Sequence, residues 1–422
     1  MEIKNVEFPN GARFSFNPMP AMTSVAIGIW VKTGSRYETK ENNGISHFLE
    51  HLLFKGTKTR SALQLSQEIE GIGGVLNGFT SEEYTCYYVK VLKNHFHKAV
   101  DILFDMILNP LLKPKDIEKE KGIIIEELNM YLDMPSHYVD DMLSELMWHS
   151  HPLGRRILGT PDTIRAVNKK SITQYMKNNY SSPNIVVAVA GNYSFKRIKD
   201  MIHPYIEKLN PGKITNFDGY KKSQKKPSMK MEKAKKEQTH LAIGFKAYSR
   251  VDKRRYRAKL LSVILGGNMS SRLFQQIREK HSLAYAIHAH LNQHVDTGAF
   301  EIQTGIKNEN TSQAIELIIK EVKKIKKNSV EKNELVHAKE YVIGQIMLSL
   351  ENTKNNMIQI GDNILTFGKV IPLKETLHAL KNISREEILE TANDIFKPES
   401  VNLALVGSVP QKKFLEDILT SI

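Results

Sequence analysis

An internal repeat constrains the fold of this 422-residue chain more than any other feature of its sequence. The apolar segment Ala-Ile-Gly at 26–28 recurs at 242–244, and Gly191 has a counterpart in Gly407; both pairs lie 216 positions apart. A helical segment around Glu127 corresponds to 335–347, with Gln345 in the place of Glu127 at an offset of 218. Because one hydrophobic core rarely serves so long a chain, these ordered matches predict two homologous domains.

Local patterns in the first half indicate both strands and helices. Strand-like segments rich in β-branched and aromatic residues lie at 23–31, in two pieces within 73–91, and at 184–191. Helical spacing is found at 61–71, at 95–108, at 115–132, and from Pro135 to Trp148. Strands and helices do not alternate regularly, so we expect an α+β fold in which each domain is a mostly antiparallel sheet packed with helices.

Residues 211–236 interrupt this pattern. The segment contains Pro211, Gly212, Gly219, Pro227 and many lysines, with little apolar periodicity, which is typical of a linker. We therefore place a first domain at 1–212, a basic linker at 213–234 and a second domain at 235–422.

One motif in the first domain carries recognisable chemistry. Residues 44–56 read Gly-Ile-Ser-His-Phe-Leu-Glu-His-Leu-Leu-Phe-Lys-Gly, so His47, Glu50 and His51 share one face of a helix. Two imidazoles one turn apart can hold Zn²⁺, and the neighbouring carboxylate can act on a water bound to it. With 15 His and 46 acidic residues in the chain, chance would produce this order only ~0.06 times. The alternative is a buried histidine pair on a core helix, which a third ligand would exclude.

The composition indicates the class of protein and the compartment in which it works. The chain is 41% hydrophobic and 25% charged, as in soluble globular proteins, and no apolar run reaches the ~18 residues of a membrane span. Its first residues show neither a secretory nor a transit pattern. Cys86 is the single cysteine, so an intrachain disulfide is impossible and a metal site must use His and carboxylates. We expect a bacterial cytoplasm or, alternatively, a mitochondrial matrix.

The formal charge of +14 raises the question of nucleic acid or an anionic membrane as partner. The lysines, however, are spread through solvated helices and the linker, without aromatic residues between them. We interpret the charge as a solvated surface and expect neither a nucleic-acid nor a membrane partner.

Three further motifs accompany 44–56. They read Asn77-Gly-Phe-Thr-Ser-Glu-Glu-Tyr-Thr, His151-Pro-Leu-Gly-Arg and Ser271-Arg-Leu-Phe-Gln-Gln-Ile-Arg-Glu-Lys-His-Ser-Leu-Ala-Tyr. Together they resemble the pitrilysin and insulin-degrading-enzyme family, specifically its shorter members related to the mitochondrial processing peptidase, over essentially the whole chain. The resemblance implies a zinc metalloendopeptidase whose domains are halves of a clamshell chamber. Its substrates would be peptides or unfolded, presequence-like segments.

The resemblance also implies a third zinc ligand about 76 residues after the second histidine, with another glutamate seven residues before it. Those positions are Glu127 and Glu120. Spacing alone does not exclude Glu126, but Glu120 and Glu127 share a helix face, whereas Glu126 points about 100° away. We expect one Zn²⁺ per chain, held by His47, His51 and Glu127, with Glu120 beside a ligand and Glu126 solvated.

The expected mechanism follows from this ligand set. Three protein ligands leave a coordination position for water, as catalytic zinc sites require. Zinc lowers the pKa of that water to near ~7, and Glu50 accepts its proton and passes it to the leaving amine. Glu120 would orient or tune a ligand. His149 and His151, the rival metal candidates, lie in a loop with proline and are interpreted as structural.

Substrate contacts are implied by the resemblance alone. A substrate would add a β-strand along Asn77, Gly78, Phe79 and Thr80, with Phe54 and Phe79 near the residue beside the scissile bond. Arg278 and Tyr285 in the second domain would meet the substrate backbone and the oxyanion.

The second half lacks the metal motif. Between 251 and 265, where the His47 helix should recur, there is no His and no Glu. Larger relatives carry four such domains, so the resemblance implies a homodimer whose second domain serves the partner's zinc site. The glycine-rich insertion of the processing peptidase's non-catalytic subunit is not found. The alternative function is a catalytically silent scaffold or partner subunit, which a lack of stoichiometric zinc after zinc supplementation would support.

Overall fold

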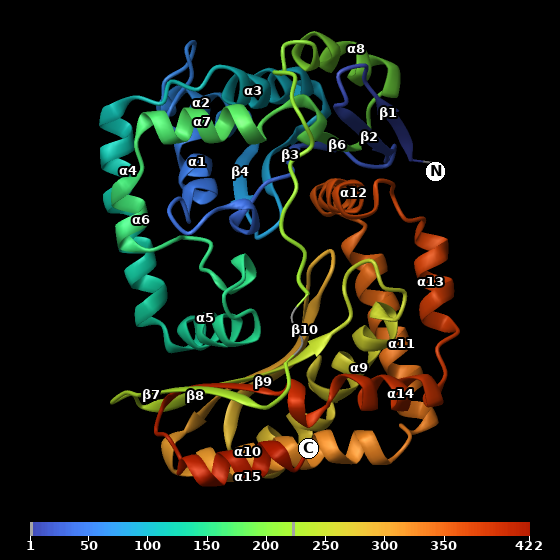
Figure 1. Ribbon diagram of the computed structural model, residues 1–422. Helices are drawn as coiled ribbons and strands as arrows, with labels where there is room; N and C mark the ends of the chain where they lie inside the picture. The colour runs from blue at the N-terminus through green and yellow to red at the C-terminus, as the bar shows by residue number, and fades with distance from the viewer. Residues whose placement is uncertain (1–2, 222–223) are drawn as a thin grey trace. The chain divides into compact units, whose positions relative to one another are not determined.

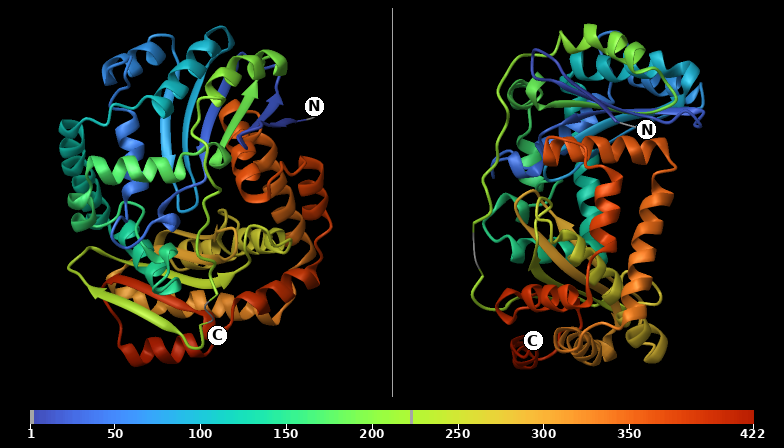
Figure 2. Two further views of the ribbon diagram at one scale, coloured as in Figure 1. Left: turned by 45° about the horizontal axis from the view of Figure 1, so that its top comes forward. Right: turned by 90° about the vertical axis from the view of Figure 1, so that its right-hand side faces the viewer.

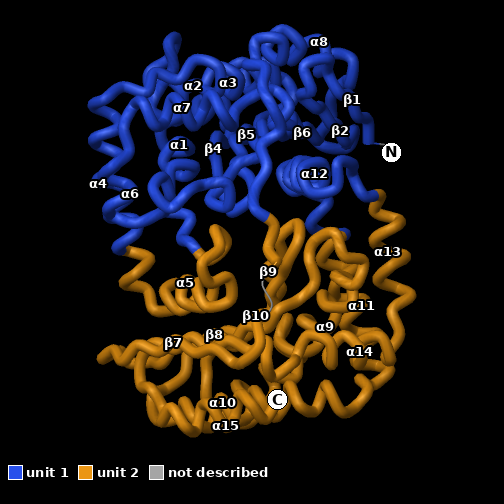
Figure 3. The backbone as a smooth tube through the Cα atoms, in the orientation of Figure 1, with its two compact units in different colours: residues 1–129, 155–218, 347–371 blue, residues 130–154, 219–346, 372–422 orange. Residues whose placement is uncertain are grey.

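The computed structural model describes residues 3–221 and 224–422. Contacts between backbone positions divide the chain into two compact units (Figure 3). Unit 1 comprises Met1–Asn129, Arg155–Asp218 and Met347–Ile371. Unit 2 comprises Met130–Gly154, Gly219–Ile346 and Pro372–Ile422. Each unit contains one β-sheet with helices packed on it, as Figure 1 shows.

The sheet of unit 1 has six strands in the order β1-β2-β6-β3-β5-β4. They are β1 (Lys4–Glu7), β2 (Arg13–Pro18), β3 (Ser24–Val31), β4 (Val75–Thr80), β5 (Thr85–Leu92) and β6 (Ile185–Gly191). Only the neighbours β2 and β6 are parallel; the other pairs are antiparallel. Along β3, Ile27 and Ile29 point into one core, whereas Ala26 and Trp30 point into another, because successive side chains alternate between faces.

Helices cover both faces of this sheet. One face packs against α1 (Ile45–Leu53), α2 (Ala62–Glu70), α3 (Phe96–Leu108), α4 (Pro114–Asp133), α6 (Pro161–Ala166), α7 (Lys169–Asn179) and α8 (Phe195–Ile206). The other face packs against α12 (Thr353–Phe367), which contributes Met357, Ile360 and Ile364 (Figure 2). The sheet is therefore buried on both sides, which explains the nearly continuous apolar sequence of β3 and β6.

Unit 2 repeats this plan with five strands in the order β7-β11-β8-β10-β9. They are β7 (Ser228–Lys233), β8 (Gln238–Ala247), β9 (Ala284–Gln293), β10 (Gly298–Lys307) and β11 (Asn402–Gly407). One face packs against α9 (Arg255–Gly266), α10 (Thr311–Lys327), α11 (Lys332–Ser349), α13 (Leu373–Lys381), α14 (Arg385–Ile395) and α15 (Lys412–Thr420). The other packs against α5 (Pro135–Met147). The predicted α+β class with mostly antiparallel sheets is confirmed.

The repeat seen in the sequence recurs in space. The order β2-β6-β3-β5-β4 matches β7-β11-β8-β10-β9, and the first pair is parallel in both sheets. Gly28 in β3 allows α12 to approach, because a Cβ there would lie 2.4 Å from Met357 Sδ. Gly244 in β8 does the same for α5, with Met147 Sδ at 2.5 Å. The residues paired at an offset of 216 thus occupy equivalent positions.

The compact units differ from the domain boundaries at 212 and 235 in two segments. Residues 130–154 come from the first half but belong to unit 2, because the apolar side of α5 packs on β8 and β11. Residues 347–371 come from the second half but belong to unit 1, through the packing of α12 on β3 and β6. The repeat predicts the elements, whereas these contacts decide to which unit each helix belongs.

The predicted linker at 213–234 needs correction at its C-terminal end. Residues 228–233 form β7, which pairs in parallel with β11. Met229 and Met231 pack against the core of unit 2 and alternate with polar residues, a period of two that the surrounding lysines obscured. Residues 222 and 223, also within the predicted linker, lie outside the described residues.

Candidate metal centre

Helix α1 carries three of the predicted site residues, and a buried carboxylate fixes its first turn. Gly44 at its N-terminus offers no capping side chain. Instead, Glu38 accepts hydrogen bonds from the backbone N–H groups of Gly44, at 2.7 Å, and Ser46, at 2.8 Å. Burial raises the pKa of Glu38 despite these bonds. Glu38 thus performs the capping role that sequence reasoning missed, although a helix starting at glycine signals the need for a distant cap.

His47, His51 and Glu127 converge at one point. Glu127 Oε2 lies 3.8 Å from His47 Nε2 and 3.6 Å from His51 Nε2. Ligand atoms of all three residues lie within 4.8 Å of one another, and no other such group of metal-binding side chains occurs in the described part of the chain. Two imidazoles and a carboxylate are a donor set of catalytic zinc sites.

The state of the two imidazoles fits a bound cation. Burial and the neighbouring His51 lower the pKa of His47 to about 4, which keeps its ring neutral, as a metal ligand must be. His51 Nδ1 lies 3.2 Å from Glu120 Oε2. In the tautomer with the proton on Nδ1, Glu120 accepts that proton's hydrogen bond and Nε2 is left as the ligand atom on the side of Glu127. The residues present fit zinc.

Glu120 is buried behind His51. Its side chain is 1% exposed, and Lys55 Nζ lies 2.8 Å from its Oε1. Burial raises the pKa of Glu120, but hydrogen bonds from His51 and Lys55 outweigh burial and hold this pKa below its usual range. Glu120 is thus an ionised partner for His51. Lys55, in the turn after α1, was missed by sequence reasoning, because its contact with Glu120 joins segments distant in the chain.

Glu126 and Glu127 point to different sides of α4, as predicted from the helical geometry. Glu126 is exposed on α4, whereas Glu127 is partly buried beside the histidines. The structure therefore brings Glu127, and not its neighbour, into the candidate metal group.

Glu50 lies on α1 next to the edge strand β4. It is 9% exposed, and burial raises its pKa. The Thr80 hydroxyl donates a hydrogen bond of 2.6 Å to Glu50 Oε2. A buried carboxylate on the same helical face as His47 and His51 is placed to accept and return a proton at the metal group.

The predicted substrate residues Asn77–Thr80 form the end of β4, an edge strand of its sheet. Phe54 packs on the face of the sheet that α1 covers, with its ring 6.2 Å from that of Tyr87. Phe79 packs on the opposite face of the sheet, which α12 covers, and its ring lies 5.6 Å from the ring of Trp30. The two phenylalanines therefore do not line a common pocket in this structure, and their joint contact with one substrate residue stays a prediction.

Arg278 and Tyr285 lie together in unit 2. Arg278 belongs to a seven-residue π-helix, Phe274–Lys280, and its guanidinium lies 5.0 Å from the Tyr285 ring. Tyr285 is 80% exposed at the start of β9. π-Helical turns often occur at functional sites. The contact of this pair with substrate stays a prediction.

The alternative metal candidates, His149 and His151, lie in a turn after α5, outside the metal group. His151 Nδ1 accepts a hydrogen bond from the Leu153 N–H at 3.2 Å, and its ring packs edge-on against Tyr220. His149 is exposed at the end of the same turn. Neither belongs to the metal group formed by described residues.

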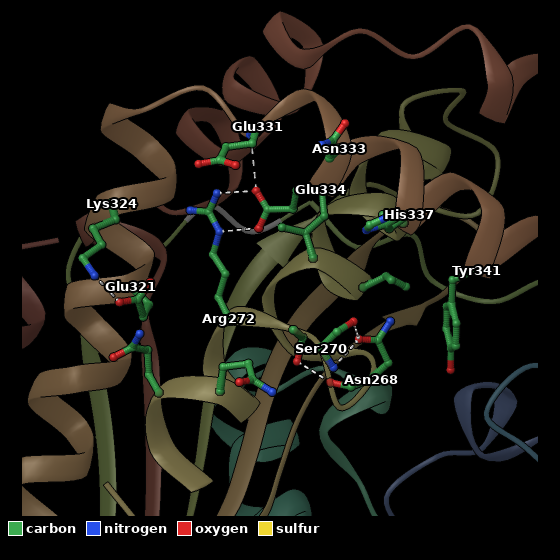
Figure 4. A pocket seen from close by; sticks show the side chains of 16 residues that line it. Asn268, Ser270, Arg272, Glu321, Lys324, Glu331, Asn333, Glu334, His337 and Tyr341 are labelled. Atoms are coloured by element: carbon green, nitrogen blue, oxygen red, sulfur yellow. Dashed lines mark hydrogen bonds and ion pairs between the residues drawn. The ribbon is translucent and has the colours of Figure 1, made fainter. Parts of the chain in front are cut away.

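A separate cavity of about 740 Å³ lies in unit 2 between α9, the π-helix, α10 and α11 (Figure 4). Arg272 spans it and makes two hydrogen bonds of 2.7 Å to Glu334. In unit 1, Arg60 precedes α2 as Arg272 precedes the π-helix, and it pairs with Asp105 of α3 at 3.0 Å. Each unit thus has an arginine that pairs with a carboxylate after α1 or α9, but the partner lies on α3 in unit 1 and on α11 in unit 2.

Comparison with known proteins places this site in a family. Residues 17–161 match the model described as insulinase (peptidase family M16), and residues 166–342 match the peptidase M16 inactive domain. The uncharacterized zinc protease YmxG of Bacillus subtilis is 39% identical over 411 residues, which cover 97% of this chain and 100% of YmxG. This chain belongs to peptidase family M16. The resemblance drawn from its motifs is thereby confirmed.

Other members and structures of peptidase family M16 are also similar to this chain. An uncharacterized zinc protease of Rickettsia felis is 35% identical and covers 94% of this chain and 96% of its own length. A protease from Helicobacter pylori shares the fold with a TM-score of 0.90 at 21% identity, covering 96% of this chain and 99% of its own. A peptidase M16 inactive domain structure from Pseudomonas fluorescens also gives 0.90, at 16% identity, covering 97% and 98%. None of the described helices is long and apolar enough to cross a membrane.

Proposed function

We propose that the chain is a zinc metalloendopeptidase that hydrolyses peptides or unfolded, presequence-like segments. One observation carries the proposal: His47, His51 and Glu127 offer three ligand atoms within 4.8 Å of one another, with Glu50 on the same helix. Membership of M16 and the zinc-protease names of its relatives support both the metal and the reaction class.

Different residues would bind the metal, transfer the proton and orient a ligand. His47, His51 and Glu127 would hold the zinc ion, which when bound polarises a water molecule and the scissile carbonyl. Glu50 accepts the proton of the attacking water and returns it to the leaving amine. Glu120, held by Lys55, keeps His51 oriented through its Nδ1.

Strand β4 supports the choice of substrate class. Its outer edge can pair with an extended chain through backbone groups, which accepts many sequences but requires the substrate to be unfolded. From the family resemblance we also propose that cleavage takes place in an enclosed chamber. Short peptides should be cut readily and a tightly folded protein spared, as followed by mass spectrometry of the fragments. Equal rates for a native folded protein would contradict the chamber.

We also propose that the enzyme is a homodimer, in which Arg278 and Tyr285 serve the zinc site of the partner chain. The support is the family resemblance together with the placement of the metal group in unit 1 and of this pair in unit 2. Two composite sites would then follow from twofold symmetry.

The decisive experiment replaces Glu50 by glutamine. The amide keeps the size of the side chain but cannot act as a base, so turnover of a peptide should fall at least ~10²-fold while zinc stays bound. Glu126→Gln, the same change on an exposed carboxylate of α4, is the control and should behave as wild type. An active Glu50→Gln protein would contradict the mechanism. Failure of the wild-type protein to bind stoichiometric zinc after zinc supplementation would favour the silent scaffold.

A further inference from the structure

Thr80 makes a contact that its expected role in substrate binding does not explain. Substrate pairing along β4 would use the backbone of Thr80. Its side chain instead turns toward α1, where the hydroxyl donates a 2.6 Å hydrogen bond to Glu50 Oε2. The proposed substrate strand and the proposed base are therefore joined by one side chain.

A glycine allows the two elements to approach closely enough for this bond. Gly78 lies on the same face of β4 as Thr80, two residues earlier. A Cβ at Gly78 would lie 3.2 Å from Glu50 Cγ and 3.2 Å from the ring of Phe54. A side chain at position 78 would force the Glu50 or Phe54 side chain to shift and so disturb the contact between Thr80 and Glu50.

The turn after Thr80 is held by a buried ion pair. The Arg36 guanidinium lies 2.6 Å from Glu83, and both side chains are buried. The backbone N–H of Arg36 also donates to the carbonyl of Glu82, at 2.9 Å. Because the turn between β4 and β5 is anchored on both main chain and side chain, the Thr80 hydroxyl is kept at one position.

Such a fixed donor affects what Glu50 can do. The terminal torsion of a glutamate side chain has broad minima, so an unrestrained carboxylate samples many orientations. A hydrogen bond to Oε2 restricts the orientation of the carboxylate and leaves the other oxygen for the reacting water. Small misplacements of a reacting group cost large factors in rate.

We propose that Thr80 is a positioning residue that orients the Glu50 carboxylate for proton transfer. The inference rests on the proposed peptidase function and adds a role for a side chain of the substrate strand. The hydroxyl acts on the chemical step, whereas the Thr80 backbone remains available to pair with substrate.

The test compares Thr80→Val with Thr80→Ser. Valine keeps the shape and β-branching of threonine but lacks the donor, and serine keeps the donor but lacks the methyl group. For hydrolysis of a quenched fluorescent peptide, Thr80→Val should lower kcat about 10- to 100-fold, the value of a hydrogen bond to a charged group. KM and the zinc-to-protein ratio should stay at their wild-type values. Thr80→Ser should recover most of kcat.

Other outcomes overturn the inference. A raised KM with normal kcat would assign Thr80 to substrate binding, and equal losses in the valine and serine variants would assign the effect to packing. Adding Thr80→Val to Glu50→Gln should cause no further loss, because Thr80 acts through Glu50; independent losses would contradict this. The Glu50→Gln variant by itself separates failure of the positioning role from failure of the peptidase function. If it is inactive while Thr80→Val is fully active, the positioning role fails and the peptidase function stands; if it is active, the peptidase mechanism itself fails.

Discussion

The two units of this chain share a plan but not a chemistry. In unit 1, α1 carries His47, Glu50 and His51, whereas α9, at the corresponding place in unit 2, has neither His nor Glu. The difference shows that the core of the repeat does not depend on the metal ligands. Apolar contacts between sheet and helices build both units, so ligands can be present in one unit and absent in the other.

The distal helices differ in the same way. Glu120 and Glu127 of α4 correspond, at an offset of 218, to Ala338 and Gln345 of α11. By contrast, an arginine–carboxylate pair occurs in each unit, Arg60 with Asp105 and Arg272 with Glu334, although the partners lie on different helices. An apolar core is thus built in both units, whereas the residues that carry the proposed chemistry occur in one.

The largest expected effect comes from making unit 1 resemble unit 2. Glu127→Gln copies the residue found at 345 and removes the negative charge of a direct ligand. Zinc affinity should fall at least ~100-fold, the upper range for losing even an indirect partner of a ligand. Competition with a chelating dye measures it. The reverse change, Gln345→Glu, should add no second zinc, because α9 supplies no histidine. Normal zinc binding by Glu127→Gln, with loss in Glu126→Gln instead, would show that the ligand was misassigned.

A second experiment tests whether the units cooperate between chains. Glu50→Gln and Arg278→Ala chains, each with its own affinity tag, are co-expressed and purified through both tags. If the site is shared, the heterodimer has one wholly wild-type site and should recover about half of wild-type activity. If Arg278 serves its own chain, both sites carry a lesion. A pure heterodimer no more active than its parents would refute the shared site.

The smallest effects test what the units have in common. Gly28→Ala and Gly244→Ala should each destabilise the protein by about 1–3 kcal/mol, because the new methyl group meets Met357 or Met147. Gly344→Ala in α11 is the control; a Cβ there meets nothing within 4 Å, so it should stabilise by about 0.5–1 kcal/mol. Denaturant unfolding measures all three. A large loss at one of the paired glycines and none at the other would show that α5 and α12 pack differently.

The sequence by itself determined the local part of the candidate site and the plan of the fold. Spacing within one helix places His47, Glu50 and His51 on one face, because helical geometry is set by neighbours in the chain. The same geometry distinguishes Glu127 from Glu126 once α4 is known to be a helix. The repeat, read from glycines and apolar runs, predicted equivalent sheets because those residues mark where helices approach strands.

Only the tertiary structure decided the contacts between distant elements. The cap from Glu38 to α1, the pair of Lys55 with Glu120 and the bond from Thr80 to Glu50 depend on side chains meeting across elements. The assignment of α5 to unit 2 and of α12 to unit 1 likewise follows from which sheet buries their apolar faces. Periodicity shows that a helix has an apolar face, but burial against a particular sheet depends on the whole chain, since many partners could cover that face equally well.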